Sequence, residues 1–117
     1  MMSVISPIGN VILKSMGVNF FGQESIGSAQ IRGNGTLILH ENALYFKRWA
    51  PKKEFIIPIS KIEAIETPRS HLGKHITRPL LKVVFINESG QYDSIAWWVR
   101  KLDKWILALE GLIQRQG

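Results

Sequence analysis

Apolar and polar residues alternate through the middle of the chain, which is the pattern of half-buried β-strands. Leu37 and Leu39 fall on one face of such a strand, and Leu44 and Phe46 fall on the matching face of the next. The two residues between these runs, 41 and 42, suit a tight turn, so the pattern predicts a hairpin. By the same reasoning we expect short strands over residues 25–32, 36–40, 43–48, 53–59, 61–67, 80–87 and 91–99.

The spacing of the apolar residues changes after residue 100. Gly111 interrupts the new pattern and weakens a helix by about 1 kcal/mol relative to alanine, but the pattern continues past it. We therefore predict a mainly β fold that ends in one α-helix, with Trp105 and Leu109 as structural core residues. The intervals of three and four that indicate an amphipathic helix are those between Leu102, Trp105, Ile106, Leu109, Leu112 and Ile113.

The segment before the β pattern supports two interpretations. Pro7 could open a short helix that Gly17 ends, because proline favours the first turn of a helix and glycine its end. Such a helix would pack on the core of the domain, or else form an exposed apolar arm for a partner or a second copy. We favour packing on the core, and divide the chain into an arm or short helix over 1–21 and a domain over 22–117.

Composition and charge narrow the classes of function. The chain has 117 residues, a hydrophobic fraction of 45% and a charged fraction of 21%, as expected for one globular domain. It lacks cysteine, which excludes disulfides, thiolate metal sites and a cysteine nucleophile. A net charge of +6 favours anionic partners. Without a long apolar run or a signal peptide, we expect a cytoplasmic protein, with peripheral attachment to a membrane as an alternative.

Three parts of the sequence together resemble the pleckstrin-homology-like (PH-like) superfold, in particular GRAM and bacterial PH-like domains. They are GTLILHENALYF at residues 35–46, IPISKI at residues 57–62, and Trp105 in the final helix. The resemblance covers most of the chain, from residue 22 to residue 112. It implies a PH-like barrel of two near-orthogonal antiparallel sheets capped by one helix. It also implies binding of phosphoinositides, peptides or proteins, although the turn at residues 32–35 offers one cation where phosphoinositide-binding members carry several.

The segment from residue 68 to residue 79 is the most unusual in composition, because it has several basic side chains and no acidic one. Gly73 could let the backbone approach an anion, which arginine and lysine would then hold. The alternative is a solvated basic loop. The two histidines are four residues apart, but Gly73 and Pro79 oppose the helix that a metal site would need, so we expect no metal. The candidate anion- or lipid-binding residues are Arg69, His71, Lys74, His75 and Arg78.

A second basic group surrounds a tryptophan near residue 50. Basic residues beside an aromatic ring are typical of a membrane interface or of a surface that stacks on nucleic-acid bases. Trp98, which precedes Arg100 and Lys101, could belong to the same surface. The alternative is that Trp49 packs at the end of the barrel and the lysines are merely exposed. The candidate residues of this group are Lys47, Arg48, Trp49, Lys52 and Lys53.

The sequence contains no nucleophile elbow, phosphate-binding loop or paired-carboxylate motif. We therefore expect a non-catalytic binding module with no cofactor and no small-molecule substrate. The first hypothesis is protein interaction or self-association, through a sheet edge or the N-terminal arm. The alternative is peripheral binding of anionic membrane lipid through residues 47–53 and 69–78. Nucleic acid ranks third among the partners, and an enzyme ranks last.

Overall fold

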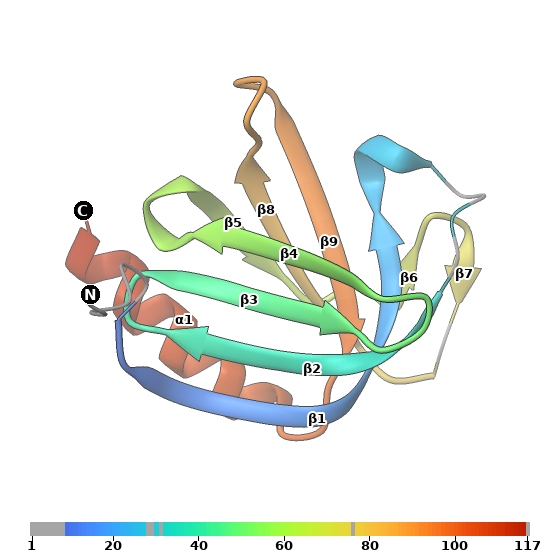
Figure 1. Cartoon of the computed structure of the whole chain (residues 1–117), viewed down its shortest axis with the longest axis horizontal. Coiled ribbons are helices and arrows are strands. Elements are labelled where there is room, and N and C mark those ends of the chain that lie inside the picture. The colour runs from blue at the N-terminus through green and yellow to red at the C-terminus, as the bar shows by residue number, and fades with distance from the viewer. Residues whose placement is uncertain (1–8, 28–29, 31, 76, 117) are drawn as a thin grey trace.

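The computed structural model describes residues 9–27, 30, 32–75 and 77–116. Within them, seven strands form one antiparallel sheet in the order β4-β3-β2-β1-β9-β8-β5 (Figure 1). Two further short strands, β6 (Ser70–His71) and β7 (Lys74–His75), pair with each other. The sheet strands are β1 (Val11–Gln23), β2 (Gly33–His40), β3 (Ala43–Arg48), β4 (Lys53–Pro58), β5 (Ile62–Glu66), β8 (Leu81–Ile86) and β9 (Tyr92–Trp98). The helical elements are the 3₁₀ turns η1 (Glu24–Ile26) and η2 (Ile59–Lys61) and the helix α1 (Leu102–Gln116).

The long strand β1 joins the two halves of the sheet. Its first part pairs with β2, and its last part, from Asn19 to Gln23, pairs with β9. The register shifts between Phe20 and Gly22, where Gly22 adopts a φ of +114° that favours glycine. This irregularity lies where the direction of the sheet changes, so that β1–β4 run across the direction of β8 and β9 (Figure 1).

The expected mainly β fold with a C-terminal helix is confirmed, but the expected pair of separate sheets is wrong. The halves belong to one hydrogen-bonded sheet because β1 is long enough to pair with both. A closed barrel is not formed by the described residues, since β4 and β5 end the sheet and do not pair with each other.

Two expectations for the start of the chain are also wrong. The arm or short helix expected over residues 1–21 is a strand wherever the structure describes it, apart from residues 9 and 10, because β1 begins at Val11. The boundary expected between residues 21 and 22 therefore lies inside β1. Residues 25–32, expected to form the first strand, begin instead within η1. Residues 1–8 lie outside the described part of the chain.

The main core lies in the interior of the bent sheet and contains side chains from both of its halves. The alternating residues of the predicted hairpin are all buried there, among them Leu37, Leu39 and Phe46. Phe20 of β1 stacks on Phe46, with ring centroids 5.3 Å apart, and Trp97 of β9 lies 5.7 Å from Phe46. Aromatic rings from three strands therefore hold the two halves together.

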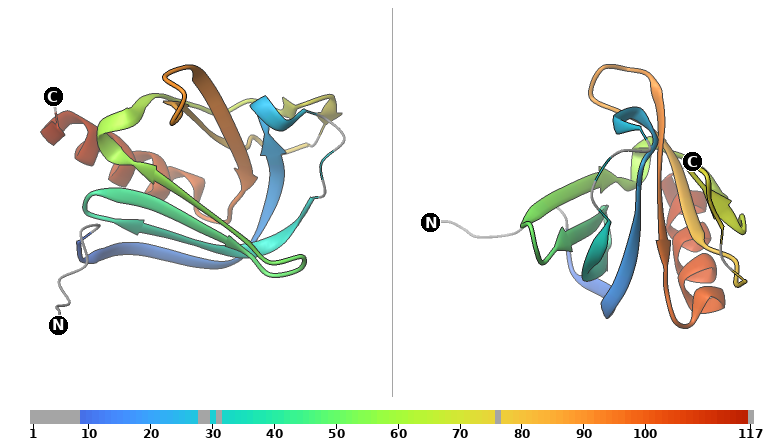
Figure 2. Two further views of the ribbon diagram at one scale, coloured as in Figure 1. Left: turned by 45° about the horizontal axis from the view of Figure 1, so that its top comes forward. Right: turned by 90° about the vertical axis from the view of Figure 1, so that its right-hand side faces the viewer.

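The helix α1 completes the core through its apolar stripe. Trp105, Leu109 and Leu112 are buried in the same cluster as the strand residues, while Leu107, on the opposite face, is 72% exposed. The helix contacts η2, β1, β5 and β8, and Figure 2 shows it alongside the sheet in two further directions. Among the described residues, no helix has both the length and the apolar character that crossing a membrane requires.

Candidate functional site

A groove of about 640 Å³ lies where the bent sheet fails to close. We call it the seam groove: one wall is the edge strand β4, and the other is the β8–β9 hairpin, with part of the β1–η1 junction. The chain passes from β4 through η2 into β5, so the two end strands separate from a common corner. Its apolar lining includes Phe55, Ile57, Phe85 and Ile95, and its polar lining includes Ser25, Glu54, Lys61, Glu88 and Asp93.

The β4 wall of the groove is an edge strand, with backbone N–H and C=O groups on its outer side. β4 pairs with β3 along its whole length, from Lys53 opposite Arg48 to Pro58 opposite Ala43. No described strand pairs with its other side. Alternate residues of an antiparallel edge strand direct their N–H and C=O groups outward, so this side can accept a further strand. Pro58, which has no N–H, marks the end of the usable edge.

The charge of the seam groove is opposite in sign to that of the whole chain. Its lining residues include the acidic Glu88 and Asp93, the basic Lys61, and Glu54, whose side chain lies on the outer face of the β4 wall, so their formal charge is −2. The chain as a whole carries +6. The groove is therefore a local negative site on a basic protein, and long-range attraction would draw a cationic segment to it.

Asp93 is the buried carboxylate of this groove. Its oxygens accept hydrogen bonds from the Gln23 Nε2, the Ser25 N, the Ser25 Oγ and the Ser94 N, at 2.7, 2.9, 2.7 and 2.8 Å. Burial alone would raise the pKa of Asp93, but these hydrogen bonds favour the ionised form and hold the pKa below its usual value. Asp93 is therefore a permanent negative charge at neutral pH.

Glu54 contributes a second acidic side chain at the β4 edge, on the face opposite Phe55 and Ile57, with which it alternates along the strand. Its carboxylate accepts a hydrogen bond from the hydroxyl group of Tyr45, on the neighbouring strand β3. Partial burial, together with this hydrogen bond and the negative charge of Glu54, raises the pKa of Tyr45 to about 12. The tyrosine consequently stays protonated and keeps donating to Glu54.

The first predicted basic segment, residues 69–78, folds back on the sheet as the β6–β7 hairpin. Arg69 Nη1 donates to the backbone oxygen of Thr77, and Leu80 N donates to the Pro68 oxygen over 2.7 Å. His71 is buried, with its Nε2 2.9 Å from the backbone oxygen of Gly22, so Nε2 carries the proton. His71 therefore ties the hairpin to the bend of β1 and is not presented to solvent.

The two histidines of this segment do not converge. His71 pairs with Lys74 and His75 pairs with Ser70, so the histidines occupy successive cross-strand pairs, whose side chains point to opposite faces. Within the described residues, no group of three or more histidines and acidic residues is placed to hold a metal ion.

The second predicted segment, residues 47–53, is the end of the β3–β4 hairpin. Arg48 is buried, with Nε donating to the Pro51 oxygen over 2.8 Å and the guanidinium 5.8 Å from the ring centre of Phe20. Trp49 is 46% exposed and its Nε1 donates to Thr36 Oγ1 over 3.0 Å. The structure thus places Arg48 in the packing of the turn, and leaves Trp49, Lys52 and Lys53 at the surface.

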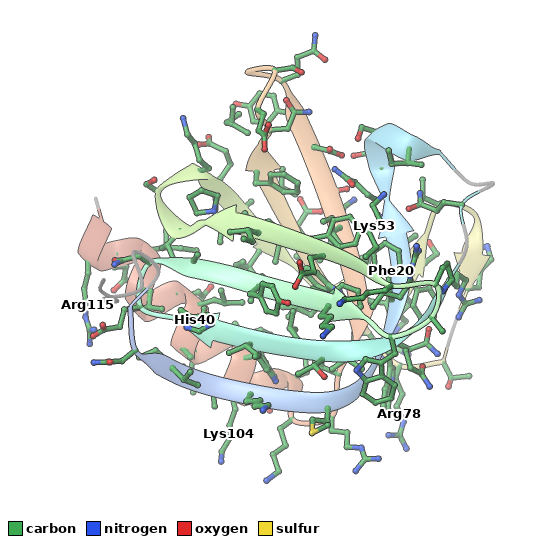
Figure 3. All side chains as sticks on the ribbon, viewed as in Figure 1. Phe20, His40, Lys53, Arg78, Lys104 and Arg115 are labelled. Carbon is green, nitrogen blue, oxygen red and sulfur yellow. The ribbon has the colours of Figure 1, made fainter. Side chains whose placement is uncertain are left out.

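A basic hollow brings Arg78 together with residues far from it in sequence. It consists of a part of about 670 Å³ at the junction of β9 and α1 and an adjoining part of about 360 Å³, with Arg78 and Trp98 in both linings. We call it the Trp98 hollow. Figure 3 shows Arg78 and Lys104 on the same side of the molecule. Its cationic residues are Arg32, Arg78, Arg100, Lys101 and Lys104, and Asp103 is the one acidic residue among the residues that line it.

Comparison with known proteins yields a likeness in structure. No protein-family model matches the chain, and no curated protein matches it in sequence. A chain in a solved structure entitled "The 8S snRNP Assembly Intermediate" is similar, with a TM-score of 0.70 and 11% sequence identity. The match covers 97% of this chain and 89% of that chain. At this identity the likeness shows the fold alone.

These findings correct the expected relationship to PH-like and GRAM domains. No family model supports that relationship, the strands form one sheet rather than two, and the similar chain comes from an snRNP assembly intermediate. The physical reason is that the segments at 35–46 and 57–62 consist of core and turn residues. Any hairpin with this alternation of apolar and polar positions would present them, so they do not identify a family.

Proposed function

We propose that this protein is a non-catalytic protein-binding module that holds an extended, basic segment of a partner protein along β4, in the seam groove. The observation that carries the proposal is the coincidence of an unpaired strand edge, an apolar floor and a negative lining. None of these alone would select an occupant. Together they match a segment in which apolar and cationic side chains alternate.

The binding mode would be strand addition. The backbone of the partner segment would pair with the outer side of β4, which supplies affinity without regard to sequence. Every second side chain of that segment would point into the groove, towards Phe55, Ile57 and Ile95. The other side chains of the segment would meet Glu54, which alternates with Phe55 and Ile57 and so lies on the opposite face of β4. Glu54 on that face and Glu88 at the groove would then select cationic residues and repel acidic ones.

The similar chain supports this kind of role. It belongs to a structure entitled "The 8S snRNP Assembly Intermediate". We propose that the present chain likewise works inside a protein assembly. The predicted self-association is the variant in which the partner is a second copy, and the predicted cytoplasmic location remains a prediction.

Binding of a short peptide tests the proposal. We expect the fluorescein-labelled hexapeptide KVRIKV to bind the full chain, as measured by fluorescence anisotropy, and the hexapeptide EVEIEV not to bind. The double variant Glu54→Lys/Glu88→Lys should weaken binding of KVRIKV at least tenfold, because it reverses the charge of the groove. The matched control, Glu63→Lys/Glu110→Lys, makes the same change in charge at exposed residues of β5 and α1 and should leave binding unchanged.

Two results would contradict the proposal. One is equal binding of the two hexapeptides, and the other is an equal loss of affinity in both double variants, which would reflect overall charge alone. Light scattering on the full chain distinguishes the occupants. A concentration-dependent dimer that the Glu54→Lys/Glu88→Lys variant abolishes would make the occupant of the groove a second copy of this chain, and would overturn the choice of a different protein.

A further inference from the structure

A row of four outward-facing residues crosses the convex face of the sheet, away from the seam groove. Asn19 of β1 lies opposite Trp98 of β9 on one side and opposite Asn34 of β2 on the other. Trp49 completes the row, because its backbone N donates to the Asn34 oxygen over 3.0 Å. Neighbouring strands are about 4.8 Å apart, so the two tryptophans stand roughly 14 Å apart along the sheet.

The side chains of this row point outward. The neighbours of Asn19 in β1, Val18 and Phe20, are buried in the core, so Asn19 faces the other side of the strand. Trp97 is likewise buried, which turns Trp98 outward. The indole of Trp49 lies on the same outer face, because it donates to Thr36, which stands between the buried residues Gly35 and Leu37.

Cations accompany both tryptophans. Trp98 stands in the Trp98 hollow, whose lining carries five cations and one acid. One of these cations, Arg32, is held in place, with its guanidinium carbon 4.0 Å from the ring centre of Phe21. At the other end of the row, Lys47 lies opposite Thr36 and therefore on the same outer face, and the exposed residue Lys52 lies in the turn after Trp49. A polyanion that touched both indoles would therefore meet positive charge along its length.

Asn19 adds an unsatisfied polar atom between the two rings. Its Oδ1 is buried and has no hydrogen-bond partner among the described residues, and Asn19 lines the smaller part of the Trp98 hollow. A buried acceptor without a donor is unfavourable, so a ligand that displaced the atoms covering it and donated there would be stabilised. The exocyclic amino groups of nucleobases are such donors, and asparagine is a residue that reads base edges.

We propose that this face binds single-stranded nucleic acid. The bases would stack on Trp49 and Trp98, an amino group would meet Asn19, and the phosphates would lie against Arg32 and Arg78. Two rings at this separation would stack on different bases. The row favours nucleic acid over a lipid surface because Trp98 is recessed in a hollow and two amides separate the rings. The exposed Met16 lies opposite Thr36 on the same face, so vesicle binding is the alternative outcome that the test has to exclude.

The sequence alone ranks nucleic acid third because it offers no continuous motif. The fold changes that ranking by placing residues 19, 34, 49 and 98 side by side on four neighbouring segments of the sheet. The proposal uses a face distinct from the seam groove and does not depend on the proposed protein binding. Each can therefore fail without the other.

Fluorescence anisotropy with labelled oligo(dC) and oligo(rC) of twelve nucleotides, whose bases carry an exocyclic amino group, tests the proposal. We expect wild type to bind both, with quenching of tryptophan fluorescence, and to bind a duplex of the same length more weakly. Trp49→Ala should weaken binding about tenfold or more, as expected when one base no longer stacks on a ring. Arg32→Ala/Arg78→Ala should weaken it and lower the slope of log affinity against log salt by about 0.7 for each phosphate that is no longer neutralised.

The control removes two cations elsewhere. Lys61→Ala/Arg115→Ala changes the net charge equally at exposed residues of η2 and α1, outside the row, and should bind as wild type does. Trp98→Ala should weaken binding as Trp49→Ala does, and Trp98→Phe, which keeps a ring in the hollow, should retain most of the binding. Three results would overturn the proposal: no binding of either oligonucleotide at low salt, equal losses in the test and control double variants, or binding of phosphatidylserine vesicles without binding of oligonucleotides.

Discussion

Ser25 donates two hydrogen bonds to Asp93, one from its backbone N over 2.9 Å and one from its Oγ over 2.7 Å. Ser25 belongs to η1, directly after β1, and Asp93 belongs to β9, so the contact spans 68 residues of sequence. It fastens η1 to the hairpin that forms one wall of the seam groove. The buried Asp93 carboxylate therefore holds this wall of the groove in position and also adds a negative charge to it.

This contact predicts a dependence of stability on pH. The pKa of Asp93 is lower in the folded state than its ordinary value of 3.8, so the unfolded chain takes up this proton first as the pH falls. The stabilisation from Asp93 is therefore complete well above pH 3.8 and is lost as the pH falls from there through the folded-state pKa. We expect Asp93→Asn to lower the free energy of unfolding at pH 7 by about 1–3 kcal/mol. Below about pH 4, the free energy of unfolding of this variant should change less with pH than that of wild type. Urea unfolding across this range measures both, with Glu88→Gln as control. An unchanged acid slope in Asp93→Asn would refute the assignment.

Gly35 lies where β2 approaches β3 closely, so adding a side chain at this position should cause a steric clash. A Cβ atom at this position would lie 2.2 Å from the Lys47 oxygen and 2.6 Å from the Phe46 ring, too close for backbone and core to accommodate. We expect Gly35→Ala to destabilise the protein by about 3 kcal/mol. Gly111→Ala in α1 is the matched control, because in the described part of the chain nothing apart from the adjacent residues and the nearby backbone of the helix itself lies within 4 Å of its added Cβ. It should stabilise the helix by about 1 kcal/mol. Thermal unfolding of both variants would show shifts of opposite sign, and shifts of the same sign would contradict the structure.

The burial of His71 and its hydrogen bond to Gly22 predict that the β6–β7 hairpin depends on this side chain. His71→Ala removes the hydrogen bond to Gly22 and leaves that backbone oxygen without this donor. We expect the free energy of unfolding to fall by about 1–3 kcal/mol and amide hydrogen exchange to become faster in residues 70–75. His75→Ala, at an exposed position of β7, should change stability by less than about 0.5 kcal/mol. Equal behaviour of the two variants would mean that His71 is not the anchor.

The contact between Tyr45 and Glu54 predicts that the Tyr45 phenol loses its proton at a higher pH than an ordinary tyrosine does. Its pKa of about 12 has three causes, partial burial first and then the hydrogen bond to Glu54 and the charge of Glu54. Glu54→Gln removes the charge and weakens the hydrogen bond, so the pKa of Tyr45 should fall towards the ordinary value of 10.0. The ultraviolet absorbance of the phenolate, with the Tyr45→Phe titration subtracted, reports it. A Tyr45 titration that Glu54→Gln leaves in place would exclude the contact.

The period-two strands and the final helix could be predicted because their apolar residues are buried at regular intervals. β1 could not, for two physical reasons. Its register shifts three times, which breaks the alternation, and its first half exposes Val11, Ile12 and Met16 on the outer face. Apolar residues that face solvent at near-helical spacing look, in the sequence, like a helix.

The sequence indicates two basic segments, but it does not show which of their side chains are buried and which are exposed. Arg48 and His71 are buried and hold the turn and the hairpin, which residue type does not indicate. The Trp98 hollow joins residues near positions 32, 78 and 104, and the seam groove depends on which strands end the sheet. Both are properties of the tertiary fold, and no local motif encodes them.

Backbone hydrogen exchange along β4 tests the central claim most directly, because strand addition must protect the outward amides of this strand. In the presence of saturating KVRIKV, we predict slower exchange at alternate amides within residues 53–57 and no change along β5, at residues 62–66. Unchanged exchange in β4 with the peptide bound, or protection along β5 instead, would contradict the account.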